Sequence, residues 1–220
     1  MMNRHALLVA AALVLLAAFG AGAYLYRAQQ SAEFQRNAVH HVAAFVRAES
    51  PARGAVDAKV QLVEFFDPGC EACRMMHPYV KSLLRTYDGK VRLVLRYATF
   101  HEGSEYVARI LEAARLQSDE LYWKTLDSVL EQQMKWASHE RPNAKLVWSF
   151  LEGSGLDLER ARREMNDPRI TSLLVQDARD LAALNVQKTP SFFVNGKPLV
   201  NFGPIGLRAL IDDEVKGAYR

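Results

Sequence analysis

The sequence predicts an α/β fold in which a β-α-β unit and a later β-β-α unit are separated by a block of helices. Two observations predict it. The spacing of apolar residues changes along the chain from a strand pattern to a helical pattern and back again. In addition, the only two cysteines, Cys70 and Cys73, stand where the first predicted strand gives way to a helix. An uninterrupted apolar run over residues 6–26 predicts an apolar helix ahead of this fold.

The β-α-β unit contains two apolar runs separated by a helical pattern. Residues 59–66 include the run VQLVEFF and are expected to form a buried strand, and the helical pattern extends over residues 74–86. Asp88-Gly89 provides a turn, after which VRLVLRY, residues 91–97, predicts a second strand. A helix of this length between two strands is typical of parallel pairing.

The helical block is expected at about residues 102–185, where apolar residues recur at three- and four-residue steps. Its last helix is predicted to begin at Asp167-Pro168, because Asp is a favoured N-cap and Pro is tolerated in the first turn. The same helix is predicted to end at Asn185.

The β-β-α unit closes the chain. Residues 191–194 and 197–200 are expected to form a hairpin around Asn195-Gly196, since both positions of its turn need a positive φ. A final helix is expected at about residues 205–215.

The N-terminal apolar run fits two kinds of targeting segment. A membrane-spanning helix needs about 20 apolar residues, whereas a cleaved signal peptide has a shorter apolar region before a small-x-small site such as Ala21-Gly22-Ala23. We favour an uncleaved anchor, because Tyr24 and Tyr26 continue the run with aromatic residues that suit a membrane interface. The predicted organisation is a signal anchor or signal peptide at residues 1–27, a helical stalk or linker at residues 28–54, and one domain at residues 55–220.

The charge balance argues against one class of partner. The chain has 28 basic and 25 acidic residues, for a formal net charge of +3. This excess is too small and too dispersed for nucleic-acid binding. The sequence contains no glycine-rich phosphate loop and no zinc-ligand pattern of His and Cys, so we expect neither a cofactor nor a metal.

The position of the two cysteines predicts thiol chemistry. The start of a helix offers unpaired backbone N–H groups and the positive end of the helix dipole, so a thiol there loses its proton more easily. A disulfide between Cys70 and Cys73 closes a very short loop, and such a loop removes little entropy from the unfolded chain. The pair therefore predicts thiol–disulfide exchange rather than a structural disulfide.

Two motifs carry a resemblance to a known family. EFFDPGCEAC, residues 64–73, and VQKTPSFFVNG, residues 186–196, resemble the thioredoxin fold of the DsbA-like group of thiol-disulfide oxidoreductases. The resemblance extends from about residue 59 to the C-terminus. It implies a thioredoxin fold with an inserted helical domain at about residues 102–185, between the two halves of the sheet.

The resemblance implies a role for five residues. Cys70 corresponds to the exposed nucleophile, Cys73 to the buried resolving thiol of the redox-active pair, and Glu64 to a buried acid that exchanges a proton with Cys73. Pro190 corresponds to a cis-proline that faces the disulfide. Thr189 is expected to line the substrate groove and to offer backbone hydrogen bonds to an extended polypeptide.

The dipeptide between the cysteines departs from the family pattern. Strong oxidases of the family often carry a histidine there, whereas this chain has Glu71-Ala72. A carboxylate repels a neighbouring thiolate. We therefore expect a higher pKa for Cys70, and a less oxidising disulfide, than in the strongest oxidases.

The histidines near the motifs are expected to be structural. His77 is predicted to face solvent, and His101 is predicted to lie where a helix of the insertion begins, with Ser104 as its cap.

The resemblance implies a membrane-tethered oxidoreductase that exchanges disulfides with exported proteins, most simply as a disulfide donor. A membrane redox partner would reset the cysteines. The expected location is the bacterial inner membrane with the catalytic domain in the periplasm, or the periplasm alone if the signal is cleaved. The alternatives are a reductase or isomerase for a dedicated client, an inactive scaffold, and a module in which Cys70 and Cys73 hold Cu(I).

Overall fold

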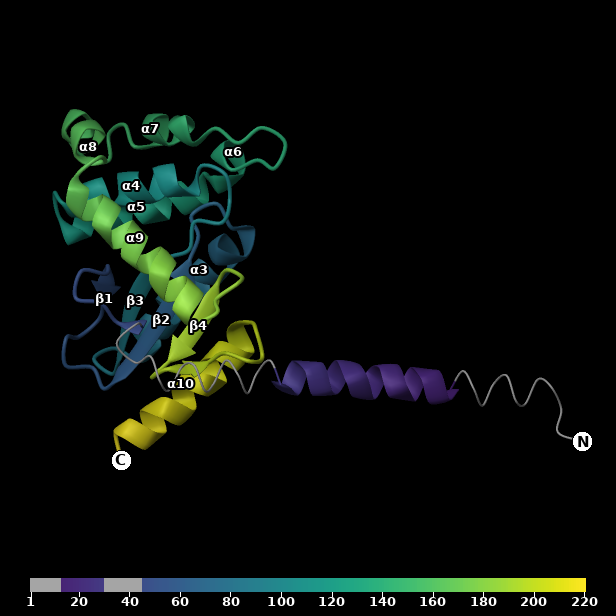
Figure 1. Ribbon diagram of the computed structural model, residues 1–220. Coiled ribbons are helices and arrows are strands. Elements are labelled where there is room, and N and C mark those ends of the chain that lie inside the picture. Colours follow the sequence, from purple (N-terminus) through teal and green to yellow (C-terminus); the bar gives the residue numbers. More distant parts are fainter. Residues whose placement is uncertain (1–12, 30–44) are drawn as a thin grey trace, which may run out of the picture.

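The computed structural model describes residues 13–29 and 45–220 (Figure 1). Residues 13–29 are helical. Within these described ranges, no helix combines the length and the apolar character needed to cross a bilayer. The predicted anchor at residues 6–26 lies partly outside them, and so does most of the predicted stalk.

One five-stranded sheet forms the centre of the folded domain, in the order β1-β3-β2-β4-β5. Strands β2 and β3 are parallel, while β1 pairs with β3, β4 with β2 and β5 with β4 in antiparallel fashion. The parallel pair and its crossover helix confirm the predicted β-α-β unit. The strands are β1 (Ala52–Arg53), β2 (Val60–Phe66), β3 (Val91–Tyr97), β4 (Ser191–Val194) and β5 (Lys197–Pro198).

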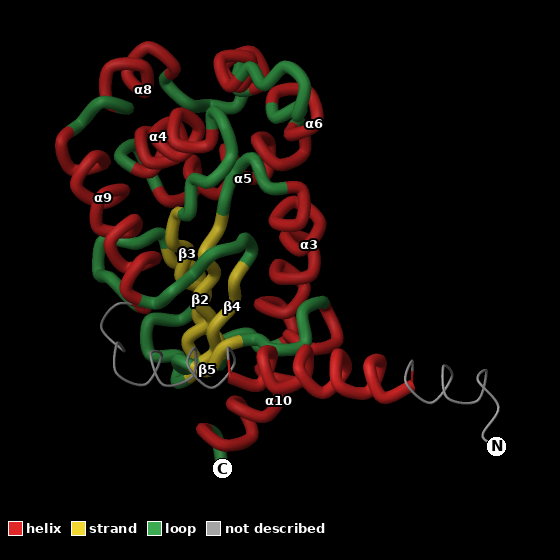
Figure 2. Tube along the Cα trace, turned by 45° about the vertical axis from the view of Figure 1, so that its right-hand side comes forward, coloured by secondary structure: helices red, strands yellow, loops and turns green. Residues whose placement is uncertain are grey.

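The alternation of side chains along β2 divides the core into two layers. Leu62 and Phe66 pack on the face covered by α3 (Glu71–Thr86) and α10 (Pro204–Ala218). Val63 and Phe65 pack on the opposite face with the C-terminal part of α9 (Pro168–Ala183). Figure 2 shows the strands between these helices. Because Glu64 shares the parity of Leu62 and Phe66, its side chain lies on the face that also receives α3.

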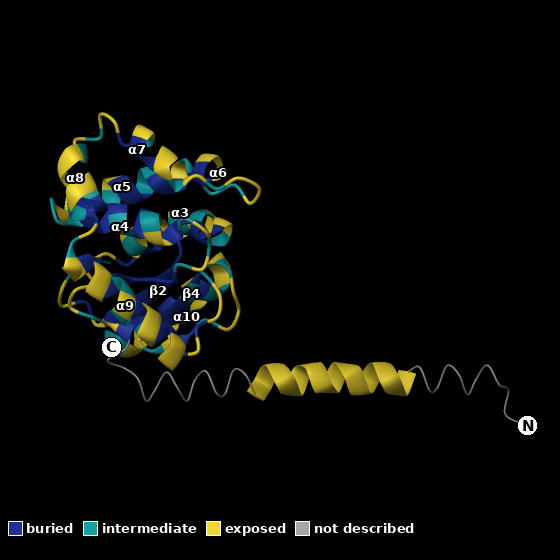
Figure 3. Ribbon diagram, turned by 45° about the horizontal axis from the view of Figure 1, so that its top comes forward, coloured by how far each residue is buried: buried dark blue, intermediate teal, exposed yellow. Residues whose placement is uncertain are grey.

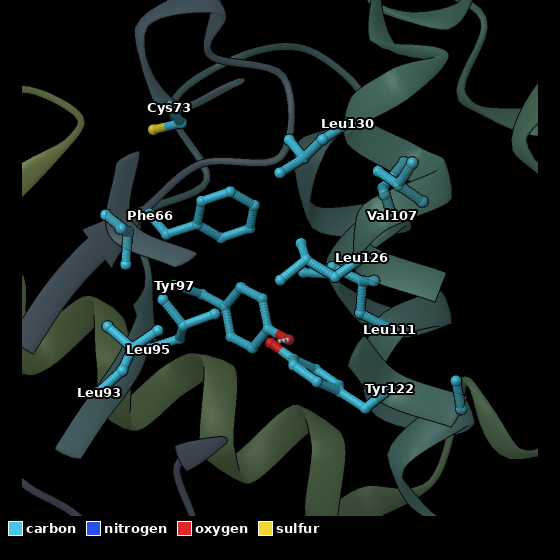
Figure 4. Close-up of a cluster of buried hydrophobic side chains, with 14 of the residues drawn as sticks. Phe66, Cys73, Leu93, Leu95, Tyr97, Val107, Leu111, Tyr122, Leu126 and Leu130 are labelled. Carbon is cyan, nitrogen blue, oxygen red and sulfur yellow. Dashed lines mark hydrogen bonds between the residues drawn. The ribbon is translucent and has the colours of Figure 1, made fainter. Parts of the chain in front are cut away.

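The helical insertion packs at the end of the sheet where β2 and β3 finish (Figure 1). In Figure 3, the ribbon of the insertion carries both buried residues, in dark blue, and exposed residues, in yellow. In the cluster of Figure 4, the Tyr97 hydroxyl from β3 lies 3.0 Å from the Tyr122 hydroxyl and donates to Glu112. The insertion consists of α4 (Ser104–Arg115), α5 (Asp119–Glu131), α6 (Gln133–Trp136), the 3-10 helix η1 (Ala144–Leu146), α7 (Val147–Phe150), α8 (Leu158–Glu164) and α9.

The predicted signals for turns and helix ends act as expected. Asp167 caps α9 by accepting a hydrogen bond from the Arg169 N–H, and Asn185 has a φ of 52° just beyond the end of this helix. Asn195 and Gly196 have φ values of 49° and 79°, which confirms the predicted hairpin turn. The hairpin is shorter than predicted, because β5 ends at Pro198.

The folded domain begins earlier in the chain than the predicted boundary at residue 55. Phe45 is 2% exposed and packs on Phe193, with ring centroids 4.5 Å apart. Arg47 donates to Asp180 of α9, and β1 adds an edge strand to the sheet. Residues 45–53, which the sequence analysis assigned to the linker, therefore belong to the domain. Short segments such as β1 carry too little periodicity to be recognised as strands.

Candidate active site

Cys70 and Cys73 occupy the start of α3, directly after the turn that follows β2. Cys70 is the N-cap residue and Cys73 lies in the first turn. Both are free thiols. Cys73 is 0% exposed, as expected for the resolving thiol. Cys70, which we expected to be exposed, is only 6% exposed.

The loop before β4 covers Cys70. The Thr189–Pro190 peptide bond is cis, as the resemblance implied. The Cys70 thiol donates a hydrogen bond to the Thr189 carbonyl oxygen over 3.3 Å, although the two residues are 119 positions apart. The antiparallel pairing of β4 with β2 accounts for this contact, because it returns the chain to the end of the sheet where α3 begins. This cover explains the low exposure of Cys70.

The environment of Cys70 favours the thiolate. A hydrogen bond from the Cys73 thiol, helped by hydrogen bonds from the Thr189 side chain and from the backbone N–H groups of Cys73 and Ala72, outweighs burial and lowers the pKa of Cys70 to about 5. Glu71 therefore does not keep the pKa of Cys70 near that of a free thiol, although this pKa still lies above the value of about 3.5 in the strongest oxidase of the family, as predicted. The Glu71 side chain is 57% exposed, and water screens its charge from the sulfur.

Cys73 has the opposite environment. Burial, its hydrogen bond to Cys70 and the nearby charge of Glu64 raise the pKa of the Cys73 thiol far above its ordinary value. The Cys73 sulfur accepts one hydrogen bond from a backbone group, the Asp67 N–H at 3.5 Å. The pair therefore consists of one acidic thiol and one thiol that stays protonated.

Glu64 lies in the middle of β2, under the start of α3. It is 3% exposed, and its neighbours across the sheet are Leu95 and Phe192. Burial, followed by repulsion from the Cys70 thiolate, raises the pKa of Glu64 to about 8. The carboxyl group is therefore able to hold or release a proton near neutral pH.

Asp67 is a buried residue of the site that the sequence analysis did not single out. Its side chain is 0% exposed. One oxygen accepts from the Gly69 N–H at 2.8 Å and from the Ser104 hydroxyl. The other accepts from the Phe100 N–H at 2.8 Å, the His101 N–H at 3.0 Å and the His101 ring Nδ1 at 2.7 Å. The carboxylate thereby ties the loop ahead of Cys70 to the start of α4.

His77 and His101 each form a hydrogen bond to a carboxylate, which the sequence did not predict. His101 pairs with Asp67, and although burial lowers the pKa of His101, the hydrogen bond and the charge of Asp67 raise it overall. The Ser104 hydroxyl, which was predicted to cap α4, instead donates a hydrogen bond to Asp67. His77, predicted to face solvent, is 17% exposed and bonds to Asp127 of α5 over 2.7 Å.

Gln133 is a second buried polar residue that the sequence did not reveal. It is 1% exposed and belongs to α6 of the insertion. Its amide nitrogen donates to the carbonyl oxygens of Pro68 at 2.7 Å and Cys70 at 3.0 Å. Its amide oxygen accepts from the Arg74 Nε at 3.2 Å. No sequence pattern marks such a residue, because its partners are about 60 positions away.

The donor set of the site does not form a multidentate metal centre. Across residues 13–29 and 45–220, no three His, Cys, Asp or Glu side chains are placed to share a metal ion.

The different environments of the two thiols predict selective alkylation. In the reduced protein, we expect the reaction of Cys70 with iodoacetamide to rise with pH around a midpoint of about 5. Cys73 is expected to stay unlabelled to at least about pH 9, because it is buried and protonated. Mass spectrometry of the labelled peptide separates the two sites. A single midpoint near about 8.5, as in a free cysteine, would contradict the geometry of the site.

Comparisons with known proteins agree with this geometry. The sequence model of a family described as thioredoxin matches residues 47–213. A protein from Salinispora tropica named Na(+)/H(+) antiporter NhaA 3 is 33% identical over 159 residues, which cover 72% of this chain but 23% of that protein. The chain thus spans less than a quarter of that relative's length.

Two further similar proteins are matched over most of their own length. The probable disulfide bond formation protein D of Bacillus anthracis is 28% identical over 169 residues, which cover 74% of this chain and 77% of that protein. The crystal structure of a thioredoxin-like oxidoreductase from Silicibacter pomeroyi has 28% identity and a TM-score of 0.68, covering 81% of this chain and 98% of that one. Because the family match covers most of the chain and includes both cysteines and the Thr189–Pro190 bond, the chain belongs to the thioredoxin family.

Proposed function

We propose that the chain is a thiol-disulfide oxidoreductase that exchanges disulfides with exported proteins through Cys70 and Cys73. One observation carries the proposal. At the N-terminus of α3 the pKa of Cys70 is lowered to about 5, while its neighbour Cys73 is fully buried and protonated. Exchange needs this asymmetry, because one sulfur must attack or leave as a thiolate and the other must wait.

The oxidising reaction is a transfer of two electrons from the substrate. A substrate thiolate attacks the Cys70 sulfur of the oxidised protein, the Cys70–Cys73 bond breaks, and Cys73 leaves and takes up a proton. In this proposal Glu64, whose pKa is raised to about 8, supplies that proton. A second substrate thiolate then attacks the substrate sulfur of the mixed disulfide, and Cys70 leaves as a thiolate. The substrate gains a disulfide and the protein ends with two thiols.

The acidity of Cys70 favours the donor direction. A stabilised thiolate stabilises the reduced form of the pair, which makes the disulfide a strong oxidant. The relative named disulfide bond formation protein D supports the same direction. The alternative is a reductase or isomerase that serves a dedicated client.

The location belongs to the proposal as well. The apolar run at residues 6–26 supports a membrane anchor, with the domain in the periplasm, or a cleaved signal that leads there. Disulfides form and persist in such an oxidising compartment. Exported proteins with thiols or disulfides would be the substrates, and a membrane redox partner would reset the pair.

The equilibrium of the pair with glutathione tests the direction of transfer. We expect a reduction potential toward the oxidase end of the family scale, at about −120 mV. A value near about −270 mV would make the chain a reductase. The measurement uses the full chain and follows the fraction of reduced Cys70 by alkylation and mass spectrometry. The Cys73→Ala variant, which has no intramolecular disulfide, serves as the control.

A further inference from the structure

The helical insertion holds the loop ahead of Cys70 from two sides. On one side the segment between β3 and α4, together with Ser104 at the start of α4, donates hydrogen bonds to the Asp67 carboxylate, as described above. On the other side, Gln133 of α6 bonds to the carbonyl oxygens of Pro68 and Cys70. Residues 67–70, which lead into the redox helix, are therefore held to the insertion by the Asp67 side chain on one side and by the Gln133 side chain on the other.

Both N–H groups and the oxygen of the Gln133 amide form hydrogen bonds to the redox loop and α3. Its nitrogen has two hydrogens, and each finds a carbonyl oxygen, one of Pro68 and the other of Cys70. Its oxygen accepts from Arg74, one turn into α3. An amide turned by half a rotation would place its oxygen against the two carbonyl oxygens. The site therefore accepts the amide in one orientation.

The short helix that carries Gln133 is itself firmly placed. Trp136, three residues on, is 0% exposed and donates its indole N–H to the Val129 carbonyl oxygen at 2.9 Å. The backbone of α6 is thus anchored in the insertion core. Gln133 is able to hold the loop because its own position is set independently of the loop.

We propose that Gln133 is a positioning residue for Cys70, through which the helical insertion sets the reactivity of the redox pair. This inference rests on the proposed function, in which Cys70 is the sulfur that forms the mixed disulfide. One of the carbonyl groups that Gln133 binds belongs to Cys70 itself. The sulfur of the same residue must face the N–H groups of Ala72 and Cys73. Rotation of that carbonyl changes the aim of the Cys70 sulfur at those donors and at Thr189. Gln133 opposes the rotation by donating to the carbonyl oxygens of Pro68 and Cys70, in addition to the hydrogen bond that the Cys70 oxygen accepts from the Arg74 N–H at 3.1 Å.

A matched pair of substitutions tests the role. Gln133→Met keeps a similar volume and flexibility but removes both donors. The Pro68 carbonyl oxygen then loses the Gln133 hydrogen bond, while the Cys70 carbonyl oxygen keeps its hydrogen bond from the Arg74 N–H at 3.1 Å. Gln132→Met makes the same change one residue earlier, on a partly exposed side chain for which no hydrogen bond is found within the described residues. The readouts are the pH dependence of Cys70 alkylation by iodoacetamide, the equilibrium with glutathione, and the thermal unfolding temperature.

The proposal expects a specific change in the reactivity of Cys70. In Gln133→Met the midpoint of alkylation moves to higher pH, and the rate at about pH 5 falls about two- to tenfold, the factor that corresponds to one hydrogen bond. Gln132→Met keeps the wild-type profile. A purely structural role would lower the unfolding temperature of Gln133→Met and leave the alkylation profile unchanged, and that outcome overturns the proposal.

A second variant decides the question if Gln133→Met does not fold. Gln133→Glu is isosteric and still accepts from Arg74, but an ionised carboxylate donates no hydrogen bond. It is expected to raise the alkylation midpoint as well, and a wild-type profile in Gln133→Glu overturns the proposal. The wild-type profile tests the proposed function separately. An alkylation midpoint near that of a free thiol in the wild type removes the proposed function, whereas a shared acidic midpoint in wild type and variants removes only the role of Gln133.

Discussion

Replacing Cys70 by serine is expected to reduce disulfide exchange to the uncatalysed rate, whereas replacing Cys73 by alanine is expected to accumulate mixed disulfides. A serine hydroxyl stays protonated and forms no disulfide, so Cys70→Ser loses every step of the exchange. Cys73→Ala keeps the acidic thiol at position 70. Once that thiol has joined a substrate, no neighbouring sulfur is available to release it.

The measurement has two parts. Oxidation of a reduced, unfolded protein substrate gives the rate, and non-reducing electrophoresis of bacterial extracts gives the adducts. The double variant Cys70→Ser/Cys73→Ala is the control, because adducts that depend on Cys70 disappear from it. If Cys70→Ser and Cys73→Ala trapped the same substrates in equal amounts, the two sulfurs would have no separate roles and the proposed mechanism would be wrong.

Local chemistry made much of the fold and the cysteine pair predictable. The apolar run of β2, the helical period of α3 and the positive-φ turn at Asn195-Gly196 each follow from residues close together in the sequence. The place of Cys70 at a helix N-terminus follows from the same local signals. The direction of the pKa shift of Cys70 was also predicted from this position, but its size was not, because it depends on a hydrogen bond from the Cys73 thiol and on Thr189, which is 119 positions away in the chain.

The side chains that hold the active-site loop could not be predicted from the sequence for a related reason. Asp67, His101 and Gln133 are common polar residues in ordinary spacing, and their importance arises from contacts between segments more than 30 positions apart. The predicted start of the domain at residue 55 was wrong for the same reason. Residues 45–53 contain no strong periodicity, yet Phe45 and Arg47 find partners on β4 and α9 once the chain has folded. Such placements depend on the completed tertiary structure.

Replacement of Arg96 by methionine is expected to cause the largest loss of stability in the domain, about 3–5 kcal/mol at neutral pH. Arg96 lies on β3 and is 0% exposed. Its guanidinium group bonds to Asp177 at 2.7 Å and to Asp180 at 2.5 Å, and it donates to the Phe45 carbonyl oxygen at 3.2 Å. Without it, Asp180 keeps its ion pair with Arg47, but Asp177 loses the ion pair that Arg96 provides. Arg92→Met, on a partly exposed position of the same strand, is the matched control.

The dependence of this loss on pH separates lost charge pairing from lost packing. In the wild type, burial raises the pKa of Asp180, but hydrogen bonds from Arg47 and Arg96 outweigh it and lower the pKa overall. In Arg96→Met we expect the pKa values of Asp177 and Asp180 in the folded state to exceed the ordinary value of about 4. The folded variant then binds more protons than the unfolded chain, so its deficit in unfolding free energy shrinks as the pH falls from neutral toward about 4. Urea unfolding at several pH values measures the deficit. A deficit that stays constant with pH would assign the loss to packing, because a cavity left by a side chain carries no proton.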